Sequence, residues 1–201
     1  ITGSAEAGST VKLYNGSTLL GSATADSNGA FSITSSSLSD GSYSLTATAT
    51  DAAGNTSTSS SSALSITIDA TAPSAPTSLT TSSATTNDNT PTITGSAEAG
   101  STVKLYNGST LLGSATADSN GAFSITSSTL SDGSYSLKAT ATDAASNTST
   151  SSSALAITID ATAPSAPTSL TTSSTTTNDN TPTITGSAEA GSTVKLYNGS
   201  T

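Results

Sequence analysis

Internal repetition limits the fold of this chain more than any other feature. The segment 1–18, ITGSAEAGSTVKLYNGST, returns unchanged at Ile93 and again at Ile184. A period of roughly 90 residues is too long for one unit of a solenoid and matches a small domain with its own hydrophobic core. We therefore expect a first unit at residues 1–69, a complete middle unit at 70–160 and a last unit at 161–201. Because the chain starts and stops inside a repeat, we expect it to be a window from a longer polypeptide.

Within the middle unit, the pattern of apolar residues predicts strands. Polar and apolar residues alternate over short runs, and turn sequences such as Asn107-Gly108 separate the runs. The pattern predicts an all-β fold of tandem immunoglobulin-like β-sandwich domains joined end to end, with about seven strands each. The expected strands are 77–86, 90–97, 103–106, 111–117, a run around 123–125, 135–141 and 155–159. The side chains that we expect to point inward include Val103, Leu105, Phe123, Ile125, Leu137 and Ile157.

One tyrosine in each repeat has two interpretations. Tyr135 follows the turn Leu130-Ser-Asp-Gly-Ser at the start of the sixth expected strand. This is the position of a tyrosine corner, in which the phenol binds backbone a few residues upstream. It is equally the position of an ordinary strand tyrosine. The Cys and Trp residues that pin antibody domains are absent.

The composition excludes several classes of function. The chain has no Cys and no His, so it cannot form a Ser/His or Cys/His nucleophile or a zinc site with those ligands. Acidic residues lie in turns and strand ends without aromatic walls, and we expect no enzyme activity. A net charge of −9 with only four basic residues argues against a nucleic-acid partner. No apolar run is long enough to insert into a membrane.

Four motifs resemble a known family. They are Glu-Ala-Gly-Ser-Thr-Val-Lys-Leu-Tyr, Leu-Ser-Asp-Gly-Ser-Tyr, Thr-Asp-Ala-Ala-Gly-Asn and Ile-Asp-Ala-Thr-Ala-Pro. In this order they resemble the bacterial Ig-like tandem repeats of large biofilm-associated and RTX-type surface adhesins. The resemblance implies an extracellular stalk on the bacterial cell surface that requires calcium and supports cell adhesion or biofilm formation. The second copy departs from the third motif, because Ser146 replaces its Gly.

The acidic residues suggest a cation site where one repeat meets the next. Counting strands from the linker places the loops of Glu98, Asp118 and Asp143 at the entry pole of the middle unit, and those of Asp88 and Asp132 at its exit pole. The exit residue of the first unit then meets these entry loops. Calcium binds several oxygen ligands, and carboxylates that close together would repel one another without it. We therefore predict calcium at the junctions, with a metal-free linker that is loose. The predicted ligands are Asp69, Glu98, Asp143 and Asn147 at the first junction, and Asp160 and Glu189 at the second.

Two acidic residues fit ordinary turn chemistry rather than the metal site. Asp40 and Asp132 lie in Asp-Gly turns, where a carboxylate ordinarily accepts hydrogen bonds from nearby backbone. We therefore interpret them as turn residues.

Two other functions remain compatible with the sequence. The chain could be a subunit of an extracellular filament or surface layer, assembled by lateral or strand-exchange contacts between identical chains. It could also be a carbohydrate-binding module, for which Tyr14, Tyr106 and Tyr197 are the only candidate platforms. The expected partners of the stalk itself are the neighbouring repeats of the same chain.

Overall fold

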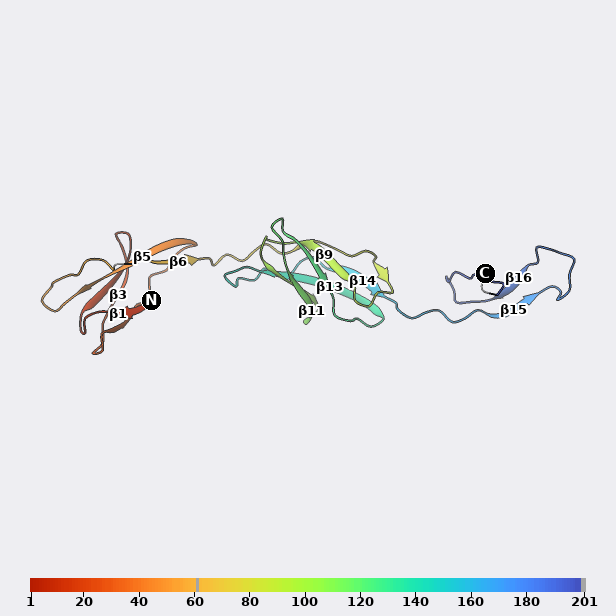
Figure 1. Ribbon diagram of the computed structural model, residues 1–201, viewed down its shortest axis with the longest axis horizontal. Coiled ribbons are helices and arrows are strands. Elements are labelled where there is room, and N and C mark those ends of the chain that lie inside the picture. Colours follow the sequence, from red (N-terminus) through yellow and green to blue (C-terminus); the bar gives the residue numbers. More distant parts are fainter. Residues whose placement is uncertain (61, 200–201) are drawn as a thin grey trace.

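The computed structural model describes residues 1–60 and 62–199, and these residues form strands, turns and loops. Figure 1 shows three units in a row, from the red N-terminal unit through the green middle unit to the blue C-terminal unit. The described residues contain no helix that is long and apolar enough to cross a membrane. The predicted all-β class is confirmed.

The middle unit is a sandwich of two sheets. In spatial order, one sheet contains β11 (Thr110–Thr116), β10 (Thr102–Asn107), β13 (Gly133–Thr142), β14 (Leu155–Ile159) and β8 (Thr85–Thr86). The other contains β12 (Ala122–Thr126), β9 (Thr92–Ser96) and β7 (Thr77–Thr80). All pairs are antiparallel except β14 with β8, which run parallel.

The core lies between these two sheets and follows from the alternation of side chains along each strand. On β10, Val103 and Leu105 are fully buried, whereas Lys104 between them faces outward. All six side chains predicted to point inward are buried, and they belong to one apolar cluster: Val103, Leu105, Phe123, Ile125, Leu137 and Ile157.

The expected first strand, residues 77–86, is divided in the structure. Its first part, β7, pairs with β9, and its second part, β8, pairs with β14 in the opposite sheet. Ser78 has a left-handed backbone with φ of 55°, and the register shifts between Thr77 and Thr80. An irregularity of this kind bends a strand, and the chain then crosses from one sheet to the other.

The outer units contain subsets of the same strands. In the first unit, β3 (Thr18–Thr24), β2 (Thr10–Asn15), β5 (Gly41–Thr50) and β6 (Leu64–Ile68) form one sheet. The strands β1 (Thr2–Ser4) and β4 (Ala30–Ser32) form the other. The described residues of the last unit form a single pair, β15 (Thr168–Thr172) and β16 (Ile184–Ser187).

Candidate functional site at the junctions between repeats

A carboxylate holds the chain as it leaves each sandwich. Asp40 lies in the loop before β5, and its Oδ1 accepts a hydrogen bond from the backbone N–H of Ala70 at 2.9 Å. Its Oδ2 accepts a hydrogen bond from the hydroxyl of Thr71 at 2.5 Å. The middle unit repeats this arrangement, with Asp132 accepting from Ala161 at 2.9 Å and from Thr162 at 2.5 Å. We call each such set of contacts an exit clamp.

The exit clamps lower the pKa of their carboxyl groups. The Thr71 hydroxyl and then the Ala70 amide hold the pKa of Asp40 below its ordinary value, because both hydrogen bonds favour the ionised form. The Thr162 hydroxyl does the same for the pKa of Asp132. Both carboxylates therefore stay charged at neutral pH.

A tyrosine fixes the loop that carries each clamp. The phenol of Tyr135 donates a hydrogen bond to the carbonyl of Ser131 at 2.8 Å, and Tyr43 donates to Ser39 at 2.9 Å. These contacts show that the tyrosine is a tyrosine corner. Since Ser131 immediately precedes Asp132, the corner anchors the backbone from which the clamping carboxylate extends.

The entry side of the junction is a loop at residues 143–147, between β13 and β14. The backbone N–H of Asn147 donates to Asp143 Oδ1 at 2.8 Å, and the Asn147 side-chain amide donates to Asp143 Oδ2 at 2.9 Å. The Asn147 amide lowers the pKa of Asp143, because it stabilises the carboxylate. The loop is therefore closed by its own hydrogen bonds.

A side chain of this entry loop reaches the preceding repeat. The Asn147 amide Nδ2 donates a second hydrogen bond to the backbone carbonyl of Asp69, at 3.0 Å. The two residues are 78 positions apart in the sequence. This contact joins the end of the first sandwich to the start of the second.

The structure brings some of the predicted metal ligands together and leaves others apart. Asp69, Asp143 and Asn147 meet at the first junction through the hydrogen bonds above. Glu98 instead lines an open hollow of about 350 Å³ farther along the linker, beside Ser74 and Ala75.

The second junction shows a similar separation. Glu189 lines an equivalent hollow of about 360 Å³, while the backbone N–H of Asp160 donates to Thr86 in the middle unit. Among residues 1–60 and 62–199, no group of three or more acidic side chains lies close enough together to hold a metal ion.

The oxygens that meet at the first junction match calcium in kind but are already hydrogen-bonded. A carboxylate and a backbone carbonyl are both ligands that calcium takes. The Asn147 amide occupies Asp143 Oδ2 and the Asp69 carbonyl in the structure. Calcium bound here would be held by Asp143 and Asp69, and it would have to displace this amide from both oxygens.

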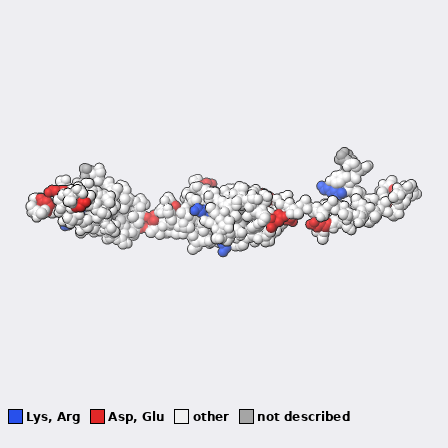
Figure 2. Space-filling model, turned by 90° about the horizontal axis from the view of Figure 1, so that it is seen from below, with Lys and Arg blue, Asp and Glu red and all other residues white. Residues whose placement is uncertain are grey.

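The exit clamps do not follow from the sequence pattern alone. The pattern indicates turn residues at Asp40 and Asp132, whereas in the structure each carboxylate bonds to the linker about 30 positions later in the chain. The sequence holds a usable signal, because Ser-Asp-Gly and Asp-Ala-Thr recur in the same order and at nearly the same spacing in both repeats. Figure 2 shows acidic side chains gathered at the narrow places between the units.

The platform tyrosine lies away from the junctions. Tyr106 is on the outer face of the five-stranded sheet, between Leu111 on β11 and Lys138 on β13, and it is half-buried. Its surroundings in the sheet are one leucine and one lysine rather than a second aromatic ring.

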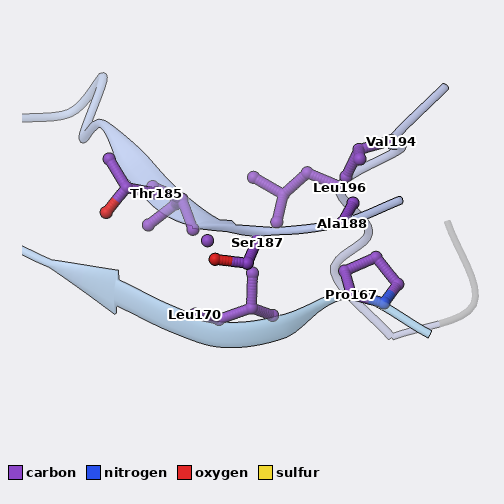
Figure 3. Close-up of a pocket in the computed structure, with 9 residues that line it drawn as sticks. Pro167, Leu170, Thr185, Ser187, Ala188, Val194 and Leu196 are labelled. Carbon is purple, nitrogen blue, oxygen red and sulfur yellow. The ribbon is translucent and has the colours of Figure 1, made fainter. Parts of the chain in front are cut away.

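One apolar hollow belongs to the last unit. It has a volume of about 470 Å³ and lies between β15, β16 and residues 194–196, with Leu170, Val194 and Leu196 on its walls (Figure 3). Val194 and Leu196 correspond to Val103 and Leu105, which are 0% exposed in the core of the middle unit. The hollow is thus the inner face of a sandwich rather than a separate binding pocket.

Known proteins show the same kind of domain. The bacterial Ig-like domain family matches residues 1–70 and 71–161. None of the curated proteins matches this sequence.

Several solved structures are similar to the chain. It is 27% identical to the BSP domain of a biofilm-associated protein, over 81% of this chain and 27% of that one, with a TM-score of 0.36. It thus spans little more than a quarter of that structure. It is also similar to the fibronectin(III)-like modules of CbhA from Clostridium thermocellum, at 20% identity over 76% of this chain and 78% of that one, with a TM-score of 0.45. The D00-D0 domain of intimin is 16% identical over 73% of this chain and 77% of that one, with a TM-score of 0.30.

The family match covers both the first and the middle unit, and the middle unit has the two-sheet sandwich and the tyrosine corner expected of such a domain. This chain belongs to the bacterial Ig-like domain family.

Proposed function

We propose that these repeats form the stalk of an extracellular bacterial adhesin and hold an adhesive region away from the cell surface. The family membership and the similarity to a biofilm-associated protein and to intimin support a role in a surface adhesin. The observation that carries the proposal is the pair of contacts on one linker. Asp40 holds it from the first unit and Asn147 holds it from the second.

The path of the chain suits a spacer. In the middle unit the chain enters at the linker before β7 and leaves after β14 beside the exit clamp of Asp132. The units therefore follow one another in a row instead of folding back (Figure 1). The longest strand of the middle unit, β13, has 10 residues, as does its counterpart β5. At about 3.4 Å per residue, each repeat advances by roughly 35 Å or more.

The surface of the middle unit supports a structural role. The outward residues of its larger sheet are mainly Ser and Thr, and Ser134 on β13 bonds to Thr158 on β14 at 3.3 Å. The family and its similar structures point to a domain without enzymatic activity. A hydroxyl-rich, weakly charged sandwich of this kind suits a spacer, which holds the regions on either side of it apart.

Small-angle X-ray scattering tests the stalk directly. A compact globule of this length would have a radius of gyration of about 17 Å. We expect the chain to have a radius of gyration well above that value, and each further copy of residues 70–160 to increase it steadily. A radius of gyration near that of a globule, or one that stops growing as repeats are added, would contradict the stalk.

We also propose that calcium stiffens the junctions, with Asp69 and Asp143 as its main ligands. The carboxylate and carbonyl oxygens that meet there support this proposal, since calcium prefers such ligands. Calcium would supply positive charge between two acidic residues of successive repeats. Glu98, Asn147, Asp160 and Glu189 remain proposed contributors on the basis of the sequence.

A further inference from the structure

We infer that hydrogen bonds order the angle between successive repeats, through a linker that both repeats hold, with Asn147 as the positioning residue. The inference rests on the proposed stalk and describes how its joints are ordered before any ion binds. It assigns a specific role to the entry loop at residues 143–147, which is to receive the exit segment of the preceding repeat.

The first step is the hydrogen bonding of residues 69–71. The carbonyl of Asp69 accepts from Asn147, and the N–H of Ala70 donates to Asp40. The N–H of Thr71 donates to the carboxylate of Asp69 at 3.2 Å, and its hydroxyl donates to Asp40. Asp69 is thus bonded to the second sandwich, and Ala70 and Thr71 are bonded to the first. A flexible linker differs, because its polar groups bond to water.

The entry loop has the same conformation whether or not it contacts another repeat. The loop at residues 51–55 of the first unit is its counterpart, and within residues 1–60 and 62–199 it makes no hydrogen bond to another repeat. Its Asn55 donates to Asp51 from the backbone at 2.8 Å and from the side chain at 2.8 Å. The same bonds in the loop at 143–147 are 2.8 Å and 2.9 Å long.

The backbone of the two loops agrees as well. Gly54 and its counterpart Ser146 both have left-handed backbones, with φ of 89° and 75°. Ser146 therefore keeps the loop conformation that the glycine has, although a left-handed backbone disfavours residues other than glycine. A loop that is already in its binding shape loses little conformational freedom when it docks.

The third step concerns charge. The sequence predicts that Asp69 and Asp143 repel each other and loosen a metal-free linker. In the structure, the carboxylate of Asp69 accepts from its own linker at Thr71, and the Asn147 amide lies between Asp143 and the Asp69 carbonyl. The amide is a neutral donor that bonds to both oxygens, so it links the two acidic residues of the joint.

Distance measurements between spin labels in EDTA test the inference. The chain has no cysteine, so single cysteines at Ser17 and Ser109, both exposed and at equivalent hairpin turns, can be labelled specifically. We expect a narrow distance distribution between the two labels in double electron–electron resonance. Asn147→Ala should broaden this distribution at least twofold, because the entry loop loses its contact with Asp69.

The chain provides matched controls. Asn55→Ala removes the same bond within its loop but no contact between repeats, and the distribution should stay as narrow as in the parent. Asp40→Ala should broaden it, whereas Asp132→Ala should not, because Asp132 holds the linker of the other junction. Thermal unfolding followed by circular dichroism verifies that each variant is folded.

Two results would overturn the inference. One is a broad distribution for the parent in EDTA, and the other is equal widths for Asn147→Ala and Asn55→Ala. If the chain is extended in scattering but the label distances are broadly distributed, the proposed stalk stands and this inference is wrong. A compact chain in scattering contradicts the stalk itself.

Discussion

At the scale of single residues, the exit clamps make the junction sensitive to acid. The pKa values of Asp40 and Asp132 are lowered by the Thr hydroxyl and then by the backbone amide that they accept from. A carboxyl group whose pKa is lowered in the folded state stabilises that state at pH values above its unfolded pKa of about 3.9. This contribution is lost as the pH falls through the folded pKa. We therefore expect the clamps to hold at pH 4 and above and to open only below it. The amide resonance of Ala70, followed by NMR from pH 7 to pH 2, should shift with a midpoint below about 3.9. A midpoint at or above this value, or a resonance that shifts equally in Asp40→Ala, would show that the clamp does not control the linker.

At the scale of elements, the smaller sheet of the middle unit depends on the ring that β12 places on β9. Phe123 is 4% exposed, and its ring lies so close to Gly95 that a Cβ there would be 2.7 Å from the ring. Removing the ring should cost about 3–5 kcal/mol of unfolding free energy, a large part of the stability of a small domain. We expect Phe123→Ala to unfold the middle unit at a clearly lower urea concentration. Phe31→Ala is the matched comparison and should cost less, because Phe31 is only half-buried. A Phe123→Ala variant that unfolds like the parent would mean that this ring does not hold the sheets together.

At the scale of the whole molecule, an ion that stiffens the junctions should change both the stability of the chain and the distribution of its end-to-end distance. Calcium at the first junction would replace the Asn147 amide on Asp143 and Asp69 with a charged and stronger contact. We expect added calcium to raise the melting temperature of the chain and to narrow the distribution of its end-to-end distance. EDTA should reverse both effects. The double variant Asp69→Ala, Asp143→Ala should lose the response to calcium. Asp51→Ala should keep it, because Asp51 is the counterpart of Asp143 in the first unit and does not lie at the junction. If calcium leaves the parent unchanged, the junction binds no calcium.

The sequence by itself determined the repeat, the sandwich and most of the core. Strict alternation on a strand sends Val103 and Leu105 to one face and Lys104 to the other, whatever the rest of the chain does. Turn residues such as Asn107-Gly108 mark where such strands end, so most of the strands and their order along the chain could also be predicted. The sequence leaves two interpretations of Tyr135, a tyrosine corner or an ordinary strand tyrosine, because the alternation alone does not show where the phenol bonds.

Only the tertiary structure decided how the repeats are joined. The clamp of Asp132 and the contact of Asn147 with Asp69 connect residues 29 to 78 positions apart, and each requires two loops to end at the same pole with matching donors and acceptors. The division of residues 77–86 between two sheets likewise depends on which edge, that of β9 or that of β14, is open to each half. Local periodicity reports which side of a strand faces the core. It does not report which distant backbone group lies within hydrogen-bond distance of a loop, because that is set by the packing of the finished sandwiches.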